Sequence, residues 1–233
     1  DNPLFWQPTP DAARYAALET IASQRIHAVD PTAVVASGGI GDDPAFLKAY
    51  LQAGGGKHVD AIAIHPYTQQ KPETVIHALL TMQRLLQQYL KPTPPIWITE
   101  WGYTSSPAWY NPVPASNMSS YQAEMAVREV LTAWSLGVPF FVYYDIQDSG
   151  TSSDGTNAMG LLDPNFASKP AMNALQTLAY YCANRRLVAI IPTSLGSLHI
   201  LKVQGETDTL LILWDEDAGT SVNIMFTRPP TAL

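Results

Sequence analysis

The feature that most constrains the fold is an alternation of short apolar runs with longer amphipathic segments, repeated four times between residues 33 and 182. Continuous apolar runs of four to eight residues are typical of parallel strands buried on both faces, and the segments between them have the length and period of helices. The pattern therefore predicts an α/β fold, a partial (β/α) TIM-type barrel of about four βα units behind a leading helix. The predicted strands are residues 33–37, 61–67, 95–100 and 138–145.

Five helices are expected, at residues 10–29, 43–51, 73–90, 119–136 and 170–181. Pro10 suits the first turn of the first helix, with Thr9 or Asp11 near its cap, and Ser119 or Ser120 can cap the fourth. The apolar residues of the first helix fall at helical spacing, which predicts that they form its buried face: Tyr15, Leu18, Ile21, Ala22, Ile26 and Val29.

The pattern changes after residue 182, because no helical period survives there. Short apolar runs between turn signals predict a small antiparallel β subdomain over 183–233, beside a barrel portion over 1–182. The runs are residues 187–191, 198–203, 210–214 and 221–226.

Composition excludes several kinds of partner. A net charge of −7 and the lack of any Lys/Arg run argue against nucleic acid and against an anionic membrane surface. No apolar run approaches the roughly 18 residues of a membrane span. Cys182 is the only cysteine, and His65 has no second His or carboxylate at ligand spacing, so neither a metal nor another cofactor is expected. The sequence does not indicate a compartment.

Polar and aromatic side chains end three of the predicted strands, where parallel α/β barrels carry their chemistry. On this pattern alone, Glu100 fits either a solvated, ion-paired carboxylate or a functional one. The strand-end residues are His65, Tyr67, Glu100, Trp101, Tyr144 and Asp145.

Three motifs together resemble the last barrel strands of clan A glycoside hydrolases, and family 39 most closely, which includes β-xylosidases and α-iduronidases. They are Trp97-Ile-Thr-Glu100-Trp-Gly, Ile64-His-Pro-Tyr67 and Tyr143-Tyr-Asp-Ile-Gln-Asp148. The segment 160–171 is similar to the stretch that leads into the family's final helix, so the resemblance covers nearly the whole chain.

The resemblance implies a retaining glycosidase acting on a carbohydrate such as a β-xyloside. It implies that Glu100 attacks the anomeric carbon, and that His65 and Tyr67 line the sugar site, with the tyrosine bonded to the nucleophile. Further substrate contacts are expected from Trp6, Trp101, Tyr144 and Asp145. Other residues fit either substrate contact or ordinary loop packing: Tyr103, Trp109, Tyr110 and Asp148.

The family's acid/base is the Glu of an Asn-Glu-Pro motif, which this sequence does not contain. Residues 1–6 resemble the loop that follows that motif, so we expect that the N-terminal half of the barrel is missing. A half-barrel exposes sheet edges and an apolar interior, which predicts a partner, either a second copy in a homodimer or the missing half.

Two functional hypotheses follow. The chain is a retaining glycosidase or its C-terminal portion, weakened by the lack of an acid that is worth roughly 10²–10⁴-fold. Alternatively, it is an inactive truncated barrel that self-associates into a pseudo-barrel and binds glycans weakly at most. A phosphate-binding barrel is disfavoured, because no Gly-rich loop with an adjacent basic residue follows a predicted strand.

Overall fold

The computed structural model describes residues 2–68, 70–107, 115–150 and 155–217. The chain divides into two compact units, Asp1–Ala183 and Asn184–Leu233, and each is described by itself.

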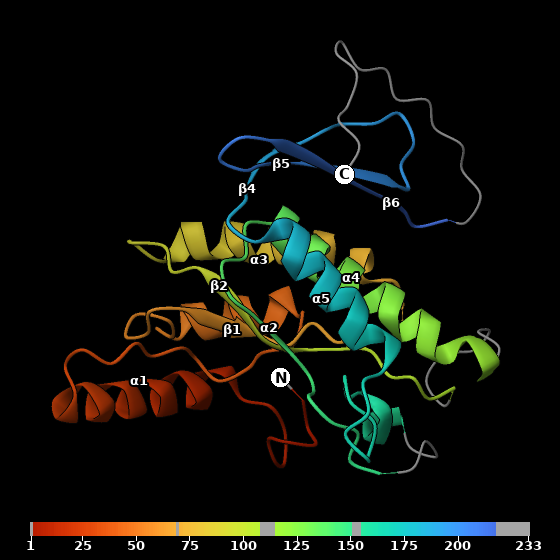
Figure 1. Cartoon of the computed structure of the whole chain (residues 1–233). Helices are drawn as coiled ribbons and strands as arrows, with labels where there is room; N and C mark the ends of the chain where they lie inside the picture. Colours follow the sequence, from red (N-terminus) through yellow and green to blue (C-terminus); the bar gives the residue numbers. More distant parts are fainter. Residues whose placement is uncertain (1, 69, 108–114, 151–154, 218–233) are drawn as a thin grey trace. The chain divides into compact units, whose positions relative to one another are not determined.

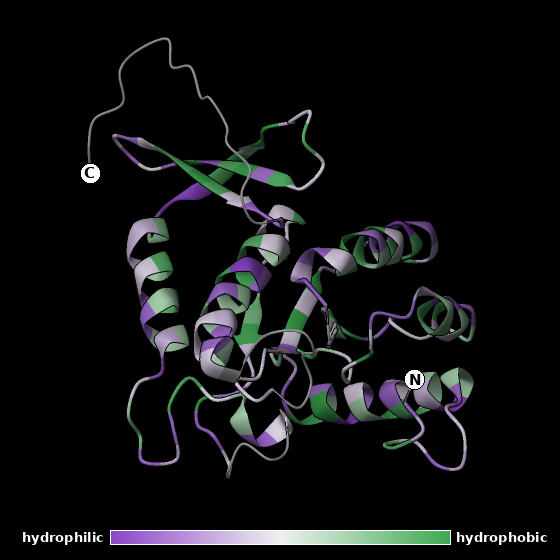
Figure 2. Cartoon of the chain, turned by 90° about the vertical axis from the view of Figure 1, so that its right-hand side faces the viewer, coloured by the Kyte–Doolittle hydropathy of each residue, from purple (hydrophilic) through white to green (hydrophobic). Residues whose placement is uncertain are grey.

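The first unit is a three-stranded parallel sheet in the order β1-β2-β3, covered by helices (Figure 1). Its helices lie in an arc around the strands (Figure 2). A mixed α/β fold with parallel strands is therefore confirmed. The elements in chain order are α1 (Ala12–Val29), α2 (Pro44–Gln52), β1 (Ile62–Ile64), η1 (Pro72–Val75), α3 (Ile76–Tyr89), β2 (Ile96–Trp101), η2 (Ala115–Asn117), α4 (Met118–Ser135), β3 (Phe141–Tyr143), η3 (Gly155–Ala158) and α5 (Pro170–Cys182).

The first predicted strand, residues 33–37, is not a regular strand. The segment runs parallel to β1 through only two isolated bridges, Ala36 to Ala61 and Ile40 to Ile64. The pair Gly38-Gly39 lies between the bridges, and glycine is a poor strand former because it has no side chain to pack. The segment still follows β1 to its carboxyl end.

The predicted buried face of α1 is wrong for most of its residues, although Tyr15 packs against the core. Leu18, Ile21 and Val29 are 55%, 58% and 89% exposed, whereas Glu19 and Ser23 are buried. The reason is that polar side chains of α1 form hydrogen bonds with residues outside the helix. Glu19 accepts hydrogen bonds from the Tyr50 hydroxyl and from the Gly56 N–H, at 3.1 Å for the latter, and Ser23 donates to the His58 carbonyl. The helix therefore packs through hydrogen bonds and leaves an apolar stripe uncovered. We define the α1 stripe as Leu18, Ile21, Ile26 and Val29.

Two predicted helix starts also need correction. Asp11 is the N-cap of α1 and accepts from the Ala13 and Arg14 N–H groups at 3.0 Å, so Pro10 precedes the helix. Helix α4 begins at Met118, before either predicted serine cap, and no side chain caps it.

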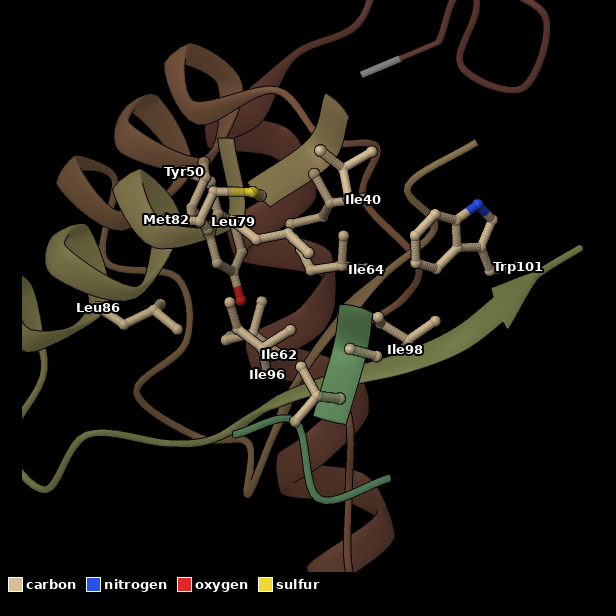
Figure 3. Packing of buried hydrophobic residues seen from close by; sticks show 14 of the residues in the cluster. Ile40, Tyr50, Ile62, Ile64, Leu79, Met82, Leu86, Ile96, Ile98 and Trp101 are labelled. Carbon is tan, nitrogen blue, oxygen red and sulfur yellow. The ribbon is translucent and has the colours of Figure 1, made fainter. Parts of the chain in front are cut away.

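The core of the first unit packs one face of the sheet against α2 and α3 (Figure 3). Ile62, Ile64 and Ile98 are fully buried, and each such side chain contributes roughly 1.5–3 kcal/mol by leaving water. The helical side of this core is made by Tyr50, Leu79, Met82 and Leu86. Packing on these residues fixes the direction of β1 and β2 and thus the position of their ends.

The other face of the sheet is partly uncovered. Side chains alternate between faces along a strand, so Trp97 and Thr99 lie opposite Ile96 and Ile98. On β3 and its flanks, Phe140 and Val142 are 43% and 41% exposed, and Phe140 packs on Trp97 with ring centroids 4.8 Å apart. We call this set, Trp97, Phe140 and Val142, the inner face.

Helix α4 buries several charged groups. The Arg128 guanidinium binds Glu73 of η1 through two hydrogen bonds, of 2.8 and 2.7 Å, and binds Glu124 at 2.7 Å. The Arg128 and Glu73 side chains are 5% and 2% exposed. This bidentate pair ties α4 to the turn before α3.

Glu129 is a buried acid of a different kind. It is fully buried, and within the described parts of the chain neither carboxyl oxygen has a hydrogen-bond partner. Burial raises its pKa well above the usual value, because the charged form is poorly solvated there. The folded state therefore holds a proton that the unfolded chain releases above a pH of about 4.5.

We expect Glu129→Gln to stabilise the protein at alkaline pH and to leave it nearly unchanged at pH 4.5. The wild-type folded state binds the proton more tightly than the unfolded state. Its free energy of unfolding should therefore fall by up to about 1.4 kcal/mol for each pH unit above the unfolded pKa. Urea unfolding of both proteins between pH 4.5 and 8 measures this difference. Glu206→Gln, an exposed change of the same charge, serves as control, and a pH-independent difference would contradict the expectation.

The second unit is a three-stranded antiparallel sheet in the order β4-β5-β6, from β4 (Arg186–Ile190), β5 (Leu198–Gln204) and β6 (Thr209–Asp215). The His199 ring stacks on Trp214 at 4.7 Å, and its Nε2 lies 2.8 Å from Glu216 Oε1. The predicted strand at 221–226 lies outside the described residues. No helix in the described ranges has both the length and the apolarity to cross a bilayer.

Candidate active site

The carboxyl ends of the three parallel strands meet at one edge of the sheet, beside a cavity of about 1000 Å³. His65 and Tyr67 follow β1, Glu100 lies near the end of β2, and Tyr144 follows β3. All four side chains line this cavity. The sheet thus brings together residues that are up to 79 positions apart in sequence.

Glu100 is held at both carboxyl oxygens. The Tyr67 hydroxyl donates to Oε1 at 2.8 Å, and His65 Nδ1 lies 3.4 Å from Oε2. The other ring nitrogen of His65 lies 2.9 Å from Thr99 Oγ1, which fixes the ring. The Glu100 side chain remains 34% exposed, so an oriented carboxylate faces the cavity.

The two side chains that contact the Glu100 carboxylate are uncharged. Burial lowers the pKa of His65, although the nearby Glu100 charge opposes this effect. Burial, together with the hydrogen bond to Glu100, raises the pKa of Tyr67, so its hydroxyl keeps its proton. The basic side chain beside Glu100 is thus a histidine that is neutral at pH 7, rather than an arginine.

Gly39 makes room for this arrangement. A Cβ on Gly39 would overlap the His65 imidazole, so the loop approaches the ring closely only because the residue is glycine. The His65 N–H also donates to the Ile40 carbonyl at 2.7 Å, which ties the same loop to the end of β1.

Aromatic side chains complete the cavity wall. Tyr144, 38% exposed, packs edge to face on Tyr67 with ring centroids 6.4 Å apart. Trp6 also lines the cavity, and its ring packs edge-on against the Tyr15 ring with centroids 6.3 Å apart. The structure therefore brings five of the seven predicted site residues together: Glu100, His65, Tyr67, Tyr144 and Trp6.

Trp101 needs correction, because it lies in the core instead of facing a ligand. It is 0% exposed and packs on Phe141 with ring centroids 6.3 Å apart. The reason is a shift in the register of the β2–β3 pairing between Ile98 and Trp101, which interrupts the alternation of side chains and places Trp101 in the same core as Ile96 and Ile98. Tyr103 is also buried, with its hydroxyl donating to the Gln70 carbonyl at 2.7 Å.

Asp145 is not among the described residues that line the cavity. One of its carboxyl oxygens is buried and has no hydrogen-bond partner in the described ranges, and burial raises its pKa. Asp148 organises its own loop: it pairs with Lys169 at 2.8 Å and accepts from the Gly160 N–H at 2.7 Å. The remaining aromatic candidates, Trp109 and Tyr110, lie outside the described residues.

Among the residues of the cavity wall that sequence reasoning missed are Tyr15, Asp42 and Phe46. Each sits in a loop or first helical turn beside a strand end. A signal was present, because helices that follow parallel strands begin near the carboxyl edge of the sheet. Tyr15 was instead assigned to the buried face of α1.

Solved glycoside hydrolases share this fold. A family 39 glycoside hydrolase from the gut symbiont Bacteroides cellulosilyticus WH2 matches with a TM-score of 0.75 and 23% identity, covering 94% of this chain and 47% of that one. A glucosidase from Croceicoccus marinus matches at a TM-score of 0.56 and 11% identity, over 88% of this chain and 50% of that one. A family 2 β-galacturonidase from Eisenbergiella tayi, bound to glycerol, matches with a TM-score of 0.52 and 16% identity. This match covers 70% of this chain and 29% of that one. The chain spans half or less of the length of these structures.

The architecture is thus that of glycoside hydrolases. Residues 6–135, more than half of the chain, match the family model of the glycosyl hydrolase catalytic core. The chain belongs to this glycosyl hydrolase family. No curated protein gives a significant match.

Proposed function

We propose that this chain carries the nucleophile site of a retaining glycosidase of the family 39 type, within a partial (β/α) barrel, and that Glu100 is the nucleophile. The observation that carries the proposal is the geometry of Glu100, whose carboxylate faces the cavity while Tyr67 donates to it at 2.8 Å. Substrates are β-xylosides or similar β-glycosides.

The chemistry follows from this arrangement. The Glu100 carboxylate attacks the anomeric carbon, the bond to the leaving oxygen breaks, and a glycosyl ester forms on Glu100. The Tyr67 hydroxyl donates to the carboxylate and the His65 ring lies beside it, which orients the carboxylate for attack. Water then cleaves the ester, releases the sugar and regenerates the carboxylate.

A second carboxyl group is needed to protonate the leaving oxygen of an ordinary glycoside, roughly 5–5.5 Å from the nucleophile in a retaining enzyme. The other acids of the described cavity are Asp42 and Asp43, and neither lies in an Asn-Glu-Pro motif. We assign the acid/base to a part of the barrel outside this chain. Unactivated glycosides then depend on that part, whereas activated aryl glycosides do not.

A partner is the second element of the proposal. The α1 stripe and the inner face are both apolar and exposed, and a contiguous apolar surface marks an interaction site. A body that closes the barrel covers the inner face and packs against α1. A second copy of this chain and an N-terminal half-barrel are the two occupants that we expect.

The purified chain should therefore exceed the monomer mass in light scattering coupled to size exclusion. Val142→Lys should shift it towards monomer, because a charge on the inner face opposes burial. Tyr180→Lys, at a side chain that is 77% exposed on α5, is the matched control. A wild-type monomer that binds no apolar dye would contradict the expectation.

Covalent labelling tests the nucleophile directly. Dinitrophenyl 2-deoxy-2-fluoro-β-xyloside needs little acid assistance and forms a long-lived ester. We expect the intact mass to rise by one fluorosugar, with the label on the peptide that contains Glu100. Glu100→Gln should take up no label, whereas Glu206→Gln should label as wild type does. A label on any other residue, or none on the wild type, would refute the assignment.

The uncovered faces also favour a second candidate function. A truncated barrel that pairs into a pseudo-barrel, without catalysis, would use the same apolar surfaces and bind glycans weakly at most. Failure of labelling, combined with a mass above that of a monomer, would favour this alternative.

A further inference from the structure

The cavity beside Glu100 has a one-sided charge. Its acidic side chains are Asp42, Asp43 and Glu100, and no lysine or arginine is found among its described lining residues. His65 does not compensate, because burial lowers its pKa. The cavity as this chain builds it is therefore negatively charged.

Asp42 and Asp43 have different roles. The Asp43 side chain caps α2 and accepts from the Ala45 N–H at 2.8 Å. Asp42 is half-buried on the loop between Ile40 and α2 and contributes to the cavity wall. Burial raises the pKa of Asp42, a hydrogen bond to its own backbone opposes this effect, and the Asp43 charge adds a smaller increase.

Three aromatic side chains line the same cavity as Asp42. Tyr15 packs on Trp6 and on Phe46 with ring centroids 6.3 and 6.2 Å apart, and all three rings line the cavity. The Tyr15 hydroxyl donates to the Gly38 carbonyl at 2.7 Å, which fixes this ring against the loop. Aromatic side chains and a carboxylate in one cavity suit the apolar face and the hydroxyl groups of a neutral sugar.

We propose that this half of the cavity selects neutral glycosides and rejects uronides, with Asp42 as the residue that sets the discrimination. The inference rests on the proposed function of Glu100, and it names the substrate class of the same site. A sugar hydroxyl donates to the Asp42 carboxylate, whereas a uronate carboxylate meets like charges on Asp42, Asp43 and Glu100. Like charges brought together in a partly desolvated site are strongly unfavourable.

The test uses two uncleavable ligands that differ only at C6, phenyl 1-thio-β-D-glucoside and phenyl 1-thio-β-D-glucuronide. Calorimetric titration at low salt should show the glucoside bound about 100-fold more tightly or better. Asp42→Asn should reduce this ratio to about 10-fold or less, because it removes a charge and keeps the shape. Glu206→Gln makes the same charge change outside the cavity lining and should leave the ratio unaltered.

The salt dependence of binding distinguishes an effect of charge from an effect of shape. If charge sets the preference, raising the ionic strength to about 0.5 M should lower the ratio of glucoside to glucuronide affinity, because the Debye length shrinks to a few ångströms. Equal binding, tighter binding of the glucuronide, or a ratio insensitive to both Asp42→Asn and salt would overturn the inference. So would a lack of binding by either ligand at millimolar concentration.

Labelling of Glu100 distinguishes this inference from the proposed function. A ligand preference without labelling would mean that the cavity selects neutral sugars but Glu100 is not a nucleophile. Labelling without a preference would mean that the nucleophile is correct and that Asp42 does not set specificity.

Discussion

Replacing Glu100 with glutamine is expected to abolish the burst of dinitrophenol that the wild-type chain releases from an activated aryl β-xyloside. The rate should fall by roughly 10³-fold or more, because an amide is a far weaker nucleophile than a carboxylate. Dinitrophenolate leaves without a proton, so the assay does not depend on an acid/base. Stopped-flow absorbance of wild type and variant measures both burst and steady state.

A rescue experiment separates chemistry from folding. Glu100→Ala opens space beside Tyr67, and azide at high concentration should then attack the anomeric carbon and give the glycosyl azide of inverted configuration. A residue that only supported the fold would show no such product. Dinitrophenol release by Glu100→Gln at the wild-type rate would contradict the nucleophile assignment, whether or not azide gives a product with Glu100→Ala.

Replacing Arg128 with methionine is expected to destabilise the protein by about 3–5 kcal/mol, because it leaves the Glu73 carboxylate buried without its counter-charge. The two side chains are almost inaccessible and share two hydrogen bonds, so little water can take the place of the guanidinium. Denaturant unfolding at pH 7 measures the loss.

Arg14→Met is the matched control, since Arg14 and Asp11 form an ion pair at 3.7 Å with both side chains largely exposed. Such pairs contribute about 0–1 kcal/mol. The double variant Glu73→Gln/Arg128→Met should recover part of the stability lost in Arg128→Met, because no unpaired charge stays buried. An equal, small loss in the Arg14 and Arg128 variants would show that the buried pair is not important for stability.

The places of β1 and β2 in the chain were predictable, because a continuous apolar run leaves a clear signal in a single sequence. The predicted range 61–67 contains β1, and 95–100 covers β2 except for its last residue, Trp101, while Glu100 and Tyr67 lie near each other as the parallel order requires. The pairing of their side chains rested on the family resemblance, because periodicity fixes which element a residue occupies and not which atoms meet.

The predictions failed where contacts with residues distant in sequence decide which way a side chain faces. Leu18 and Ile21 have the spacing of a buried face, yet α1 docks through Glu19, whose partners Tyr50 and Gly56 are distant in sequence. Trp101 lies in the core because the register of β2 shifts between Ile98 and Trp101, and such a bulge leaves no clear signal in a single sequence. Asp42 was overlooked because a second aspartate beside it has the stronger capping signal.

The division between strand ends and loops has an evolutionary consequence. Glu100 and its partners sit on or directly after β1 and β2, whereas Trp6, Tyr15 and Asp42 belong to a loop or a first helical turn. Loops accept substitutions and insertions that strands do not. Under the proposed function, lineages that carry this segment can therefore exchange one sugar preference for another through substitutions in these outer residues, while Glu100 and its partners are inherited unchanged.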